Sequence, residues 1–122
     1  MKFVNIKTEG YDSKFEAERA KELSLLQKSG LISNLREKET FVLQDGFTYV
    51  GYDRKLHKCR PITYTPDFIY NEGSKIIVED TKGIETEVFK LKRKLFMFKY
   101  PEYIFFVNFQ EKRSQRRKYK RT

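Results

Sequence analysis

The segment at residues 64–83, YTPDFIYNEGSKIIVEDTKG, constrains the fold of this chain more than any other. Its apolar runs predict two β-strands joined by a tight turn at residues 71–74. Both strands carry charged residues, Asp67 in the first and Asp80 and Lys82 in the second. Residues two apart in a strand share a face, so Asp80 and Lys82 should point the same way. If the two strands pair about the turn, Asp67 and Asp80 come close together.

Two carboxylates placed side by side repel each other, and the pKa of each rises unless a cation lies between them. A hard divalent metal is the usual reason for such a pair, and Mg²⁺ typically combines one or two carboxylates with a substrate phosphate. A nearby lysine can hold or deprotonate the attacking water, or neutralise charge on the phosphate. Pro66 lacks a backbone donor, so the first strand should lie at a sheet edge or carry a bulge there. The pattern predicts a site for Mg²⁺ or Mn²⁺.

The rest of the chain predicts one α/β domain that begins with a helix. This helix should start at Asp12 or Ser13, either of which can cap it, and should end just before Gly30. Glu16 lies one turn before Ala20, on the largely apolar face of the helix. A carboxylate on that face is unusual, so Glu16 is a further candidate for the acidic site.

The remaining elements follow from periodicity and turn residues. Alternation in residues 39–52 around Asp45-Gly46 predicts a hairpin, and residues 53–61 predict a polar loop or a second turn. Residues 85–101 predict a second helix. Residues 103–109 predict a strand covered on both faces, because their apolar run is nearly continuous. The core stripe of the second helix should consist of Val88, Leu91, Leu95 and Phe98.

The charge of the chain is positive and uneven. The formal net charge is +9, and the last twelve residues hold seven Lys or Arg and one Glu. We therefore expect a folded body at residues 1–110, a basic tail at residues 111–122, and a polyanion such as DNA as the partner of that tail. The cations of the tail are Lys112, Arg113, Arg116, Arg117, Lys118, Lys120 and Arg121.

Several other classes of protein are disfavoured. No segment approaches the roughly 18 apolar residues of a membrane span, and no signal-peptide pattern opens the chain, so we expect a cytoplasmic protein without membrane contact. If the chain is phage-encoded, that location is the host cytoplasm. The single cysteine, Cys59, excludes a disulfide within the chain. Together with His57 it offers two ligands, too few for a zinc site.

The acidic motif reads Pro66-Asp67, a spacer of twelve residues, and then Asp80-Thr81-Lys82. This arrangement resembles the PD-(D/E)XK nuclease superfamily. The resemblance is closest to phage Holliday junction resolvases of the endonuclease I type, in which a YTPDF strand precedes a hydrophobic strand that ends in an acidic residue, Thr, Lys and Gly. The chain is also similar to a family of small phage proteins of unknown function. The resemblance covers about residues 11–107.

The resemblance implies a role for each motif residue. Asp67 and Asp80 would bind the metal, and the carbonyl group of Thr81 would complete the inner coordination shell. Glu16 would bind the metal or its water, and Lys82 would orient the nucleophile. Position 79 is also acidic, but strand alternation points Glu79 away from Lys82, so Asp80 is assigned as the ligand. A bulge in this strand would reverse that assignment.

The resemblance further implies a restriction-endonuclease-like core, with a mixed sheet flanked by helices, and hydrolysis of DNA phosphodiester bonds by a metal-activated water. A resolvase cuts two strands, so a homodimer is implied. A sequence-specific or nicking endonuclease, and a non-catalytic nucleic-acid-binding or host-modulating phage protein, remain alternatives. On the second helix, Lys90, Arg93 and Lys94 could contact phosphates, and Tyr64 and Tyr70 could touch nucleic acid.

Structural explanations of the same residues also remain open. Asp67 could be a carboxylate that binds backbone after a proline, and Asp80 with Lys82 could be an exposed ion pair of little energetic value. The basic residues of the second helix could simply be its solvated face. Glu16 on an apolar helix face is the observation that these readings leave unexplained.

Overall fold

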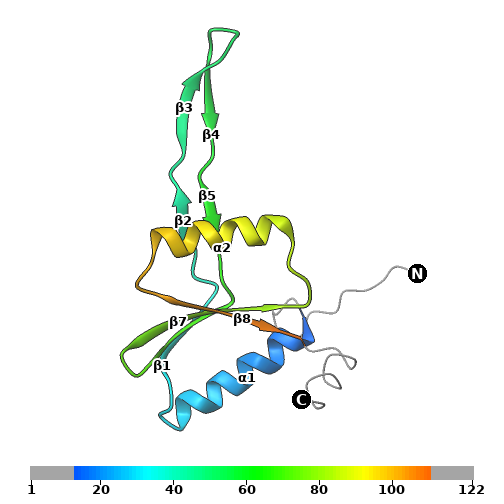
Figure 1. The fold of residues 1–122 in the computed structure, drawn as a ribbon, viewed down its shortest axis with the longest axis vertical. Helices are drawn as coiled ribbons and strands as arrows, with labels where there is room; N and C mark the ends of the chain where they lie inside the picture. Colours follow the sequence, from blue (N-terminus) through cyan, green and yellow to red (C-terminus); the bar gives the residue numbers. More distant parts are fainter. Residues whose placement is uncertain (1–12, 111–122) are drawn as a thin grey trace, which may run out of the picture.

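The computed structural model describes residues 13–110, which form two helices and eight strands (Figure 1). The elements are α1 (Lys14–Lys28), β1 (Ser33–Glu37), β2 (Phe41–Gln44), β3 (Phe47–Val50), β4 (Leu56–Cys59), β5 (Ile62–Tyr64), β6 (Phe68–Glu72), β7 (Lys75–Lys82), α2 (Glu87–Lys99) and β8 (Ile104–Phe109). The predicted α/β class, with a mixed sheet flanked by helices, is confirmed. The predicted basic tail at residues 111–122 lies outside the described residues.

The central sheet has four strands in the order β1-β6-β7-β8. Strands β1, β6 and β7 pair antiparallel, whereas β7 and β8 pair parallel, because α2 carries the chain back between them. The pairing of β6 with β7 is the strand pair expected from the sequence. Glu72 pairs with Lys75, and Gly73 between them has a φ of 64°, a left-handed conformation that favours glycine.

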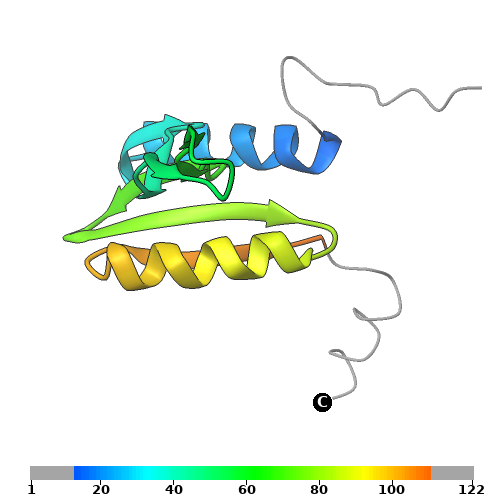
Figure 2. The same ribbon diagram turned by 90° about the horizontal axis from the view of Figure 1, so that it is seen from above.

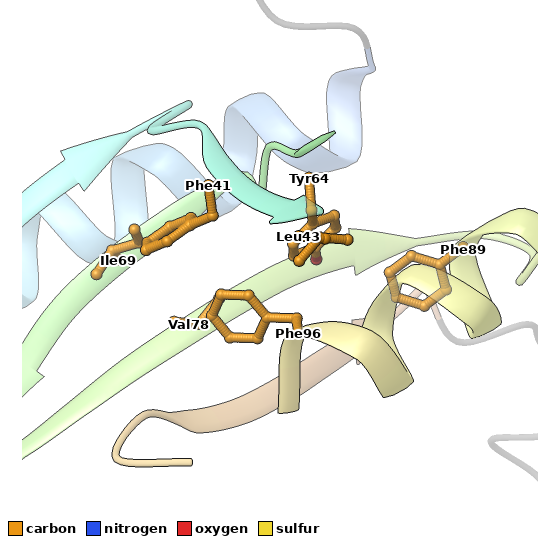
Figure 3. Close-up of a cluster of buried hydrophobic side chains, with 7 residues drawn as sticks. All are labelled: Phe41, Leu43, Tyr64, Ile69, Val78, Phe89 and Phe96. Carbon is orange, nitrogen blue, oxygen red and sulfur yellow. The ribbon is translucent and has the colours of Figure 1, made fainter. Parts of the chain in front are cut away.

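The helices cover opposite faces of this sheet (Figure 2). The face under α1 is closed by a cluster that includes Leu23 of the helix and Phe68 and Ile77 of the sheet. The opposite face packs against α2 and against β2 and β5. That second cluster is strongly aromatic, and Figure 3 shows its buried members: Phe41, Leu43, Tyr64, Ile69, Val78, Phe89 and Phe96.

Helix α1 begins and ends where the sequence places it. The side chain of Ser13 accepts a hydrogen bond from the backbone N–H of Glu16, as expected for an N-cap. At the other end Gly30 has a φ of 87°, which stops the helix. Glu16 is buried beside Ala17 and Ala20, so the carboxylate on the apolar face does point into the protein.

The expected hairpin at Asp45-Gly46 is wrong. Strand β2 pairs with β5, and β3 pairs with β4, so the chain runs on through Gly46 and turns back at residues 51–55. A Cβ atom on Gly46 would lie 3.0 Å from the carbonyl oxygen of Cys59, so this glycine permits a close strand approach rather than a turn. The segment at residues 53–61, read as a polar loop or a second turn, contains the end of this turn and then β4, and β1 was not anticipated.

Two core predictions are also wrong. In α2, Val88, Leu91 and Phe98 are exposed, because the helix turns Phe89 and Phe96 into the aromatic cluster instead. Leu95 is the one member of the expected stripe that packs against this cluster. Strand β8 is covered on one face, and its side chains alternate in exposure over residues 104–107. Ile104 and Phe106 are exposed because β8 is the last strand of the sheet and contributes no residue to the described cluster under α1.

The segment at residues 62–70 forms two strands rather than one. Strand β5 ends at Tyr64 and β6 begins at Phe68, and buried Pro66 lies in the break between them. The expected irregularity at the proline is present, but β6 is an inner strand and not an edge. Within residues 13–110, neither helix is long and apolar enough to cross a membrane.

Candidate active site

The β6–β7 register places Asp67 beside Asp80. Phe68 pairs with Glu79, so the residue before Phe68 meets the residue after Glu79. The backbone N–H of Asp67 donates to Oδ1 of Asp80 at 3.2 Å. In return, the backbone N–H and the hydroxyl of Thr81 donate to Oδ2 of Asp67 at 2.9 and 2.7 Å. The structure therefore confirms that Asp67 and Asp80 lie close together, as the turn predicts.

The two carboxyl groups have opposite pKa shifts. Burial, followed by the hydrogen bond and repulsion from Asp67, raises the pKa of Asp80 to about 7. Burial also opposes ionisation of Asp67, but hydrogen bonds with Asp80, Lys38 and Thr81 outweigh it and lower the pKa of Asp67. Near neutral pH the carboxyl pair therefore retains a proton for part of the time.

Tyr64, a member of the aromatic cluster, holds the carboxyl group of Asp80 in position. Its hydroxyl donates to Oδ2 of Asp80 at 2.5 Å. Burial and the neighbouring Asp80 charge raise the pKa of Tyr64, so it remains a donor. Its ring packs against Phe96 and Phe105, with centroids 5.6 and 6.0 Å away. Tyr64 is therefore mostly buried at the wall of the site, and its expected contact with nucleic acid stays a prediction.

Glu16 and Asp67 share one cation, Lys38. The ammonium of Lys38 lies 2.8 Å from Oε2 of Glu16 and 2.9 Å from Oδ1 of Asp67. Burial disfavours its charge, but these two ion pairs prevail and raise the pKa of Lys38. Lys38 follows β1 with a φ of 56°, a costly conformation for a residue with a Cβ. The role of Lys38 could not be predicted from the sequence, because its partners are brought to it only by the pairing of β1 with β6.

Lys82 lies on the same side of β7 as Asp80, as predicted. Its ammonium is 3.7 Å from Oδ2 of Asp80 and 4.3 Å from the ring centroid of Phe89. These groups border a cavity of about 390 Å³ that is open to solvent. The charged and titratable residues that line it are Lys38, Tyr64, Asp67, Asp80, Lys82 and Lys92.

The basic residues of α2 have different surroundings in the structure. Arg93 pairs with Glu85 at 2.5 Å, and Lys90 lies 3.4 Å from Glu87. Lys94 is exposed, and Lys92, which was not singled out, lines the cavity. Because Lys92 lies about one turn from Phe89, its orientation toward the site depends on which helix face packs inward. Contact of Lys90, Arg93 and Lys94 with phosphates stays a prediction.

Glu79 belongs to a separate, structural network on the opposite face of β7. Arg19 binds its carboxylate with two hydrogen bonds, of 2.6 and 3.0 Å. The hydroxyl of Tyr70 donates to it at 2.6 Å and the amide of Asn108 at 3.0 Å. The strand alternation is therefore as expected, with Asp80 beside Asp67 and Glu79 turned away. Tyr70 is buried with its hydroxyl bound to Glu79, away from the cavity, which contradicts its expected contact with nucleic acid.

Among residues 13–110, no three His, Cys, Asp or Glu side chains form a group arranged to hold a metal ion. The ammonium of Lys38 lies between Glu16 and Asp67, which separates the third carboxylate from the pair. Asp67 and Asp80 nevertheless supply the two carboxylates that Mg²⁺ commonly uses, beside an open cavity with room for water. The raised pKa of Asp80 is the expected property of a carboxyl pair without a cation between its members. The donor set therefore fits a hard divalent metal.

The fold and site thus define an α/β domain with a buried carboxyl pair and three lysines at one open cavity. The chain belongs to the family described as "Protein of unknown function (DUF1064)", whose model matches residues 1–116. No curated protein and no solved structure matches the chain.

Proposed function

We propose that this protein is a DNA endonuclease that depends on Mg²⁺ or Mn²⁺ and hydrolyses phosphodiester bonds. The observation that carries the proposal is the contact between Asp67 and Asp80 beside Lys82, at an open cavity. The resemblance of this motif to the PD-(D/E)XK nucleases supports the same reading. The match to a family of unknown function leaves the activity to be tested.

The charges at the cavity are balanced without a metal. Three carboxyl groups, those of Glu16, Asp67 and Asp80, lie with three ammonium groups, those of Lys38, Lys82 and Lys92. With Asp80 ionised, these six groups carry no net charge. A bound divalent cation would make the cavity positive and attractive to a phosphate.

The residues of this chain would then have separate roles. A bound divalent cation would lower the pKa of the attacking water and stabilise the negative charge on the phosphate. Asp67 and Asp80 would hold the cation, and Thr81 would keep Asp67 oriented through its two hydrogen bonds. The side chain of Lys82 is 28% exposed, so its ammonium can reach an anion in the cavity. Lys92 lines the same cavity and would contact a neighbouring phosphate.

A second candidate is a non-catalytic nucleic-acid-binding protein that keeps the same scaffold. The observation that favours it is Lys38, which already neutralises Glu16 and Asp67 without a metal. The raised pKa of Asp80 favours the nuclease instead, because a purely structural ion pair would lower it. Binding of a divalent cation distinguishes the two candidates.

For the substrate, we propose branched DNA cut by a phage resolvase or another structure-selective nuclease. The described part of the chain contains one such site, so paired cuts in two strands would require a symmetric dimer. We expect a four-way junction to bind at least about tenfold more tightly than a linear duplex, a difference of about 1.4 kcal/mol. A sequence-specific or nicking enzyme would instead bind both equally and cut at one short base sequence.

The test is a cleavage assay on four-way junctions, duplex and single-stranded DNA, with Mg²⁺, with Mn²⁺ and with EDTA. The proposal predicts cuts with either metal and none in EDTA. Asp45→Asn is the matched control for Asp67→Asn in this assay, because Asp45 is an exposed aspartate away from the cavity. Binding of DNA without cleavage under every metal condition would favour the non-catalytic protein.

A further inference from the structure

The β3–β4 hairpin extends away from the body of the protein (Figure 1). Its strands pair from Phe47 with Cys59 to Val50 with Leu56, and every residue of β3 is exposed. An isolated two-stranded hairpin is at best marginally stable in water. A projecting hairpin of this kind is suited to contact with another molecule. We call residues 47–60 the arm.

The tip of the arm has a defined geometry. The backbone N–H of Gly51 donates to the carbonyl of Lys55, and that of Arg54 donates to the carbonyl of Gly51, both at 2.9 Å. The carboxylate of Asp53 lies 2.8 Å from Nε2 of His57 and also accepts from the N–H of Lys55. The His57 ring stacks on Tyr49 at 5.3 Å. These contacts hold the end of the ribbon in shape.

The arm carries an excess of positive charge. Its cations are Arg54, Lys55, Lys58 and Arg60, and its one acidic residue, Asp53, is already bound to His57. A symmetric contact between two arms would bring these cations together and would be repulsive. A polyanion neutralises them, and the fully exposed ring of Tyr52 at the tip offers a face for base stacking. The charge therefore favours nucleic acid over a second copy of the chain.

The root of the arm is a wall of the carboxylate cavity. Strand β5 continues the arm, and its residues Thr63 and Tyr64 line that cavity. The run from Lys55, where the tip turn ends, to Tyr64 at the cavity spans up to about 30 Å, at about 3.3 Å per strand residue. One helical turn of B-DNA is about 34 Å. A duplex with one phosphate at the cavity could therefore be contacted by the tip about one turn away.

We propose that the arm is a DNA-binding ribbon that enters a groove of the duplex about one helical turn from the phosphate at the carboxylate cavity. The major groove admits a two-stranded β-ribbon. The position of the second contact rests on the proposed nuclease function, whereas DNA binding by the arm does not. The arm thereby supplies a means of reading duplex shape that the sequence alone did not indicate.

The test compares two triple variants that lose the same charge. The arm variant is Arg54→Ala, Lys55→Ala and Lys58→Ala, and the control is Lys14→Ala, Lys21→Ala and Lys28→Ala, all exposed positions on α1. Binding to a linear duplex is measured in EDTA across salt concentrations, so the result does not depend on cleavage. The arm variant should lose about 0.9 in the slope of log K against log salt for each phosphate contact removed. The control should keep the slope of the unmodified protein.

An equal loss in both variants would show that net charge alone matters and would overturn the proposal. Loss of self-association without loss of DNA binding, measured by sedimentation, would assign the arm to a second copy and would also overturn it. Far-UV circular dichroism checks that both variants fold. Hydroxyl-radical footprinting with the unmodified protein is an independent measurement, and it should show two protected segments about one turn apart. One continuous short footprint would contradict the proposed position of the arm.

Discussion

Removing the charge from either of two neighbouring acidic residues of β7, Glu79 and Asp80, should change the stability of the protein in opposite directions. Glu79→Gln leaves the guanidinium of Arg19 without the carboxylate that binds it at 2.6 Å. Breaking a buried ion pair on one side costs about 3–5 kcal/mol. The Arg19 side chain is 19% exposed, so solvent can partly compensate, and we expect about 3 kcal/mol of destabilisation.

Asp80→Asn should instead leave the protein as stable as before or make it more stable at pH 8. The pKa of Asp80 is about 7 against an ordinary value of 3.8, so its ionisation costs up to about 4 kcal/mol above pH 7. The amide removes that cost. It weakens the hydrogen bond from Tyr64, a loss of about 1–3 kcal/mol. A net gain of about 0–3 kcal/mol follows from these two estimates.

The assay is urea unfolding at pH 8 in EDTA, followed by far-UV circular dichroism and by tyrosine fluorescence, since the chain has no tryptophan. The midpoint and the slope m are compared for the unmodified protein and both variants. Destabilisation by Asp80→Asn of about 3 kcal/mol, comparable to the cost of a broken buried pair, would refute the account of the carboxyl pair. An unchanged midpoint for Glu79→Gln would refute the structural role given to that residue.

Four further predictions concern the same cavity. Because the folded-state pKa of Asp80 is raised, the protonated form of Asp80 contributes stability that is present below about pH 4 and lost as the pH rises to about 7. Urea midpoints should therefore fall across this pH range for the unmodified protein and change less for Asp80→Asn. The lowered pKa of Asp67 acts in the opposite direction at lower pH, where stability should fall as the pH decreases. Lys38→Met removes the cation between Glu16 and Asp67, so it should lower the melting temperature in EDTA, and Mg²⁺ should stabilise this variant more than the unmodified protein; equal Mg²⁺ effects on both would argue against competition between lysine and metal. Lys82→Ala should slow cleavage by several orders of magnitude and leave calorimetric metal affinity in place, whereas a loss of affinity would indicate a structural ion pair.

The carboxyl pair could be predicted because its geometry depends on short-range rules. A two-residue turn after Glu72 fixes the register of β6 on β7, and alternation then decides which residues share a face. Asp67 and Asp80 follow from these rules without any knowledge of distant contacts. The separation of Glu79 from the site follows in the same way.

The features that could not be predicted depend on contacts between distant segments. Lys38 reaches Glu16 and Asp67 because β1 pairs with β6, and the strand signal of β1 is weak. The arm exists because β2 pairs with β5 rather than with β3, a choice that the local hairpin signal at residues 45–46 does not reveal. Sequence periodicity describes each strand but not its partner.

Helix α2 shows a different limit of periodicity. Apolar residues occur on most of its faces, so a stripe through Leu91 and Phe98 and one through Phe89 and Phe96 are both compatible with the sequence. Packing selects the second stripe, because Phe96 contacts Phe41 edge-on, with centroids 5.1 Å apart, inside the aromatic cluster. The same choice turns Lys92 toward the cavity.

The central claim is that the Asp67–Asp80 pair supports metal-dependent DNA hydrolysis, and the rate of cleavage by Asp67→Asn tests it most directly. Asparagine keeps the size of the side chain and one oxygen for Thr81, so folding and DNA binding should persist. A bound metal lowers a hydrolytic barrier by several kcal/mol, so cleavage with Mg²⁺ should be at least about 100-fold slower than for the unmodified protein. Cleavage by Asp67→Asn at the unmodified rate would contradict the account.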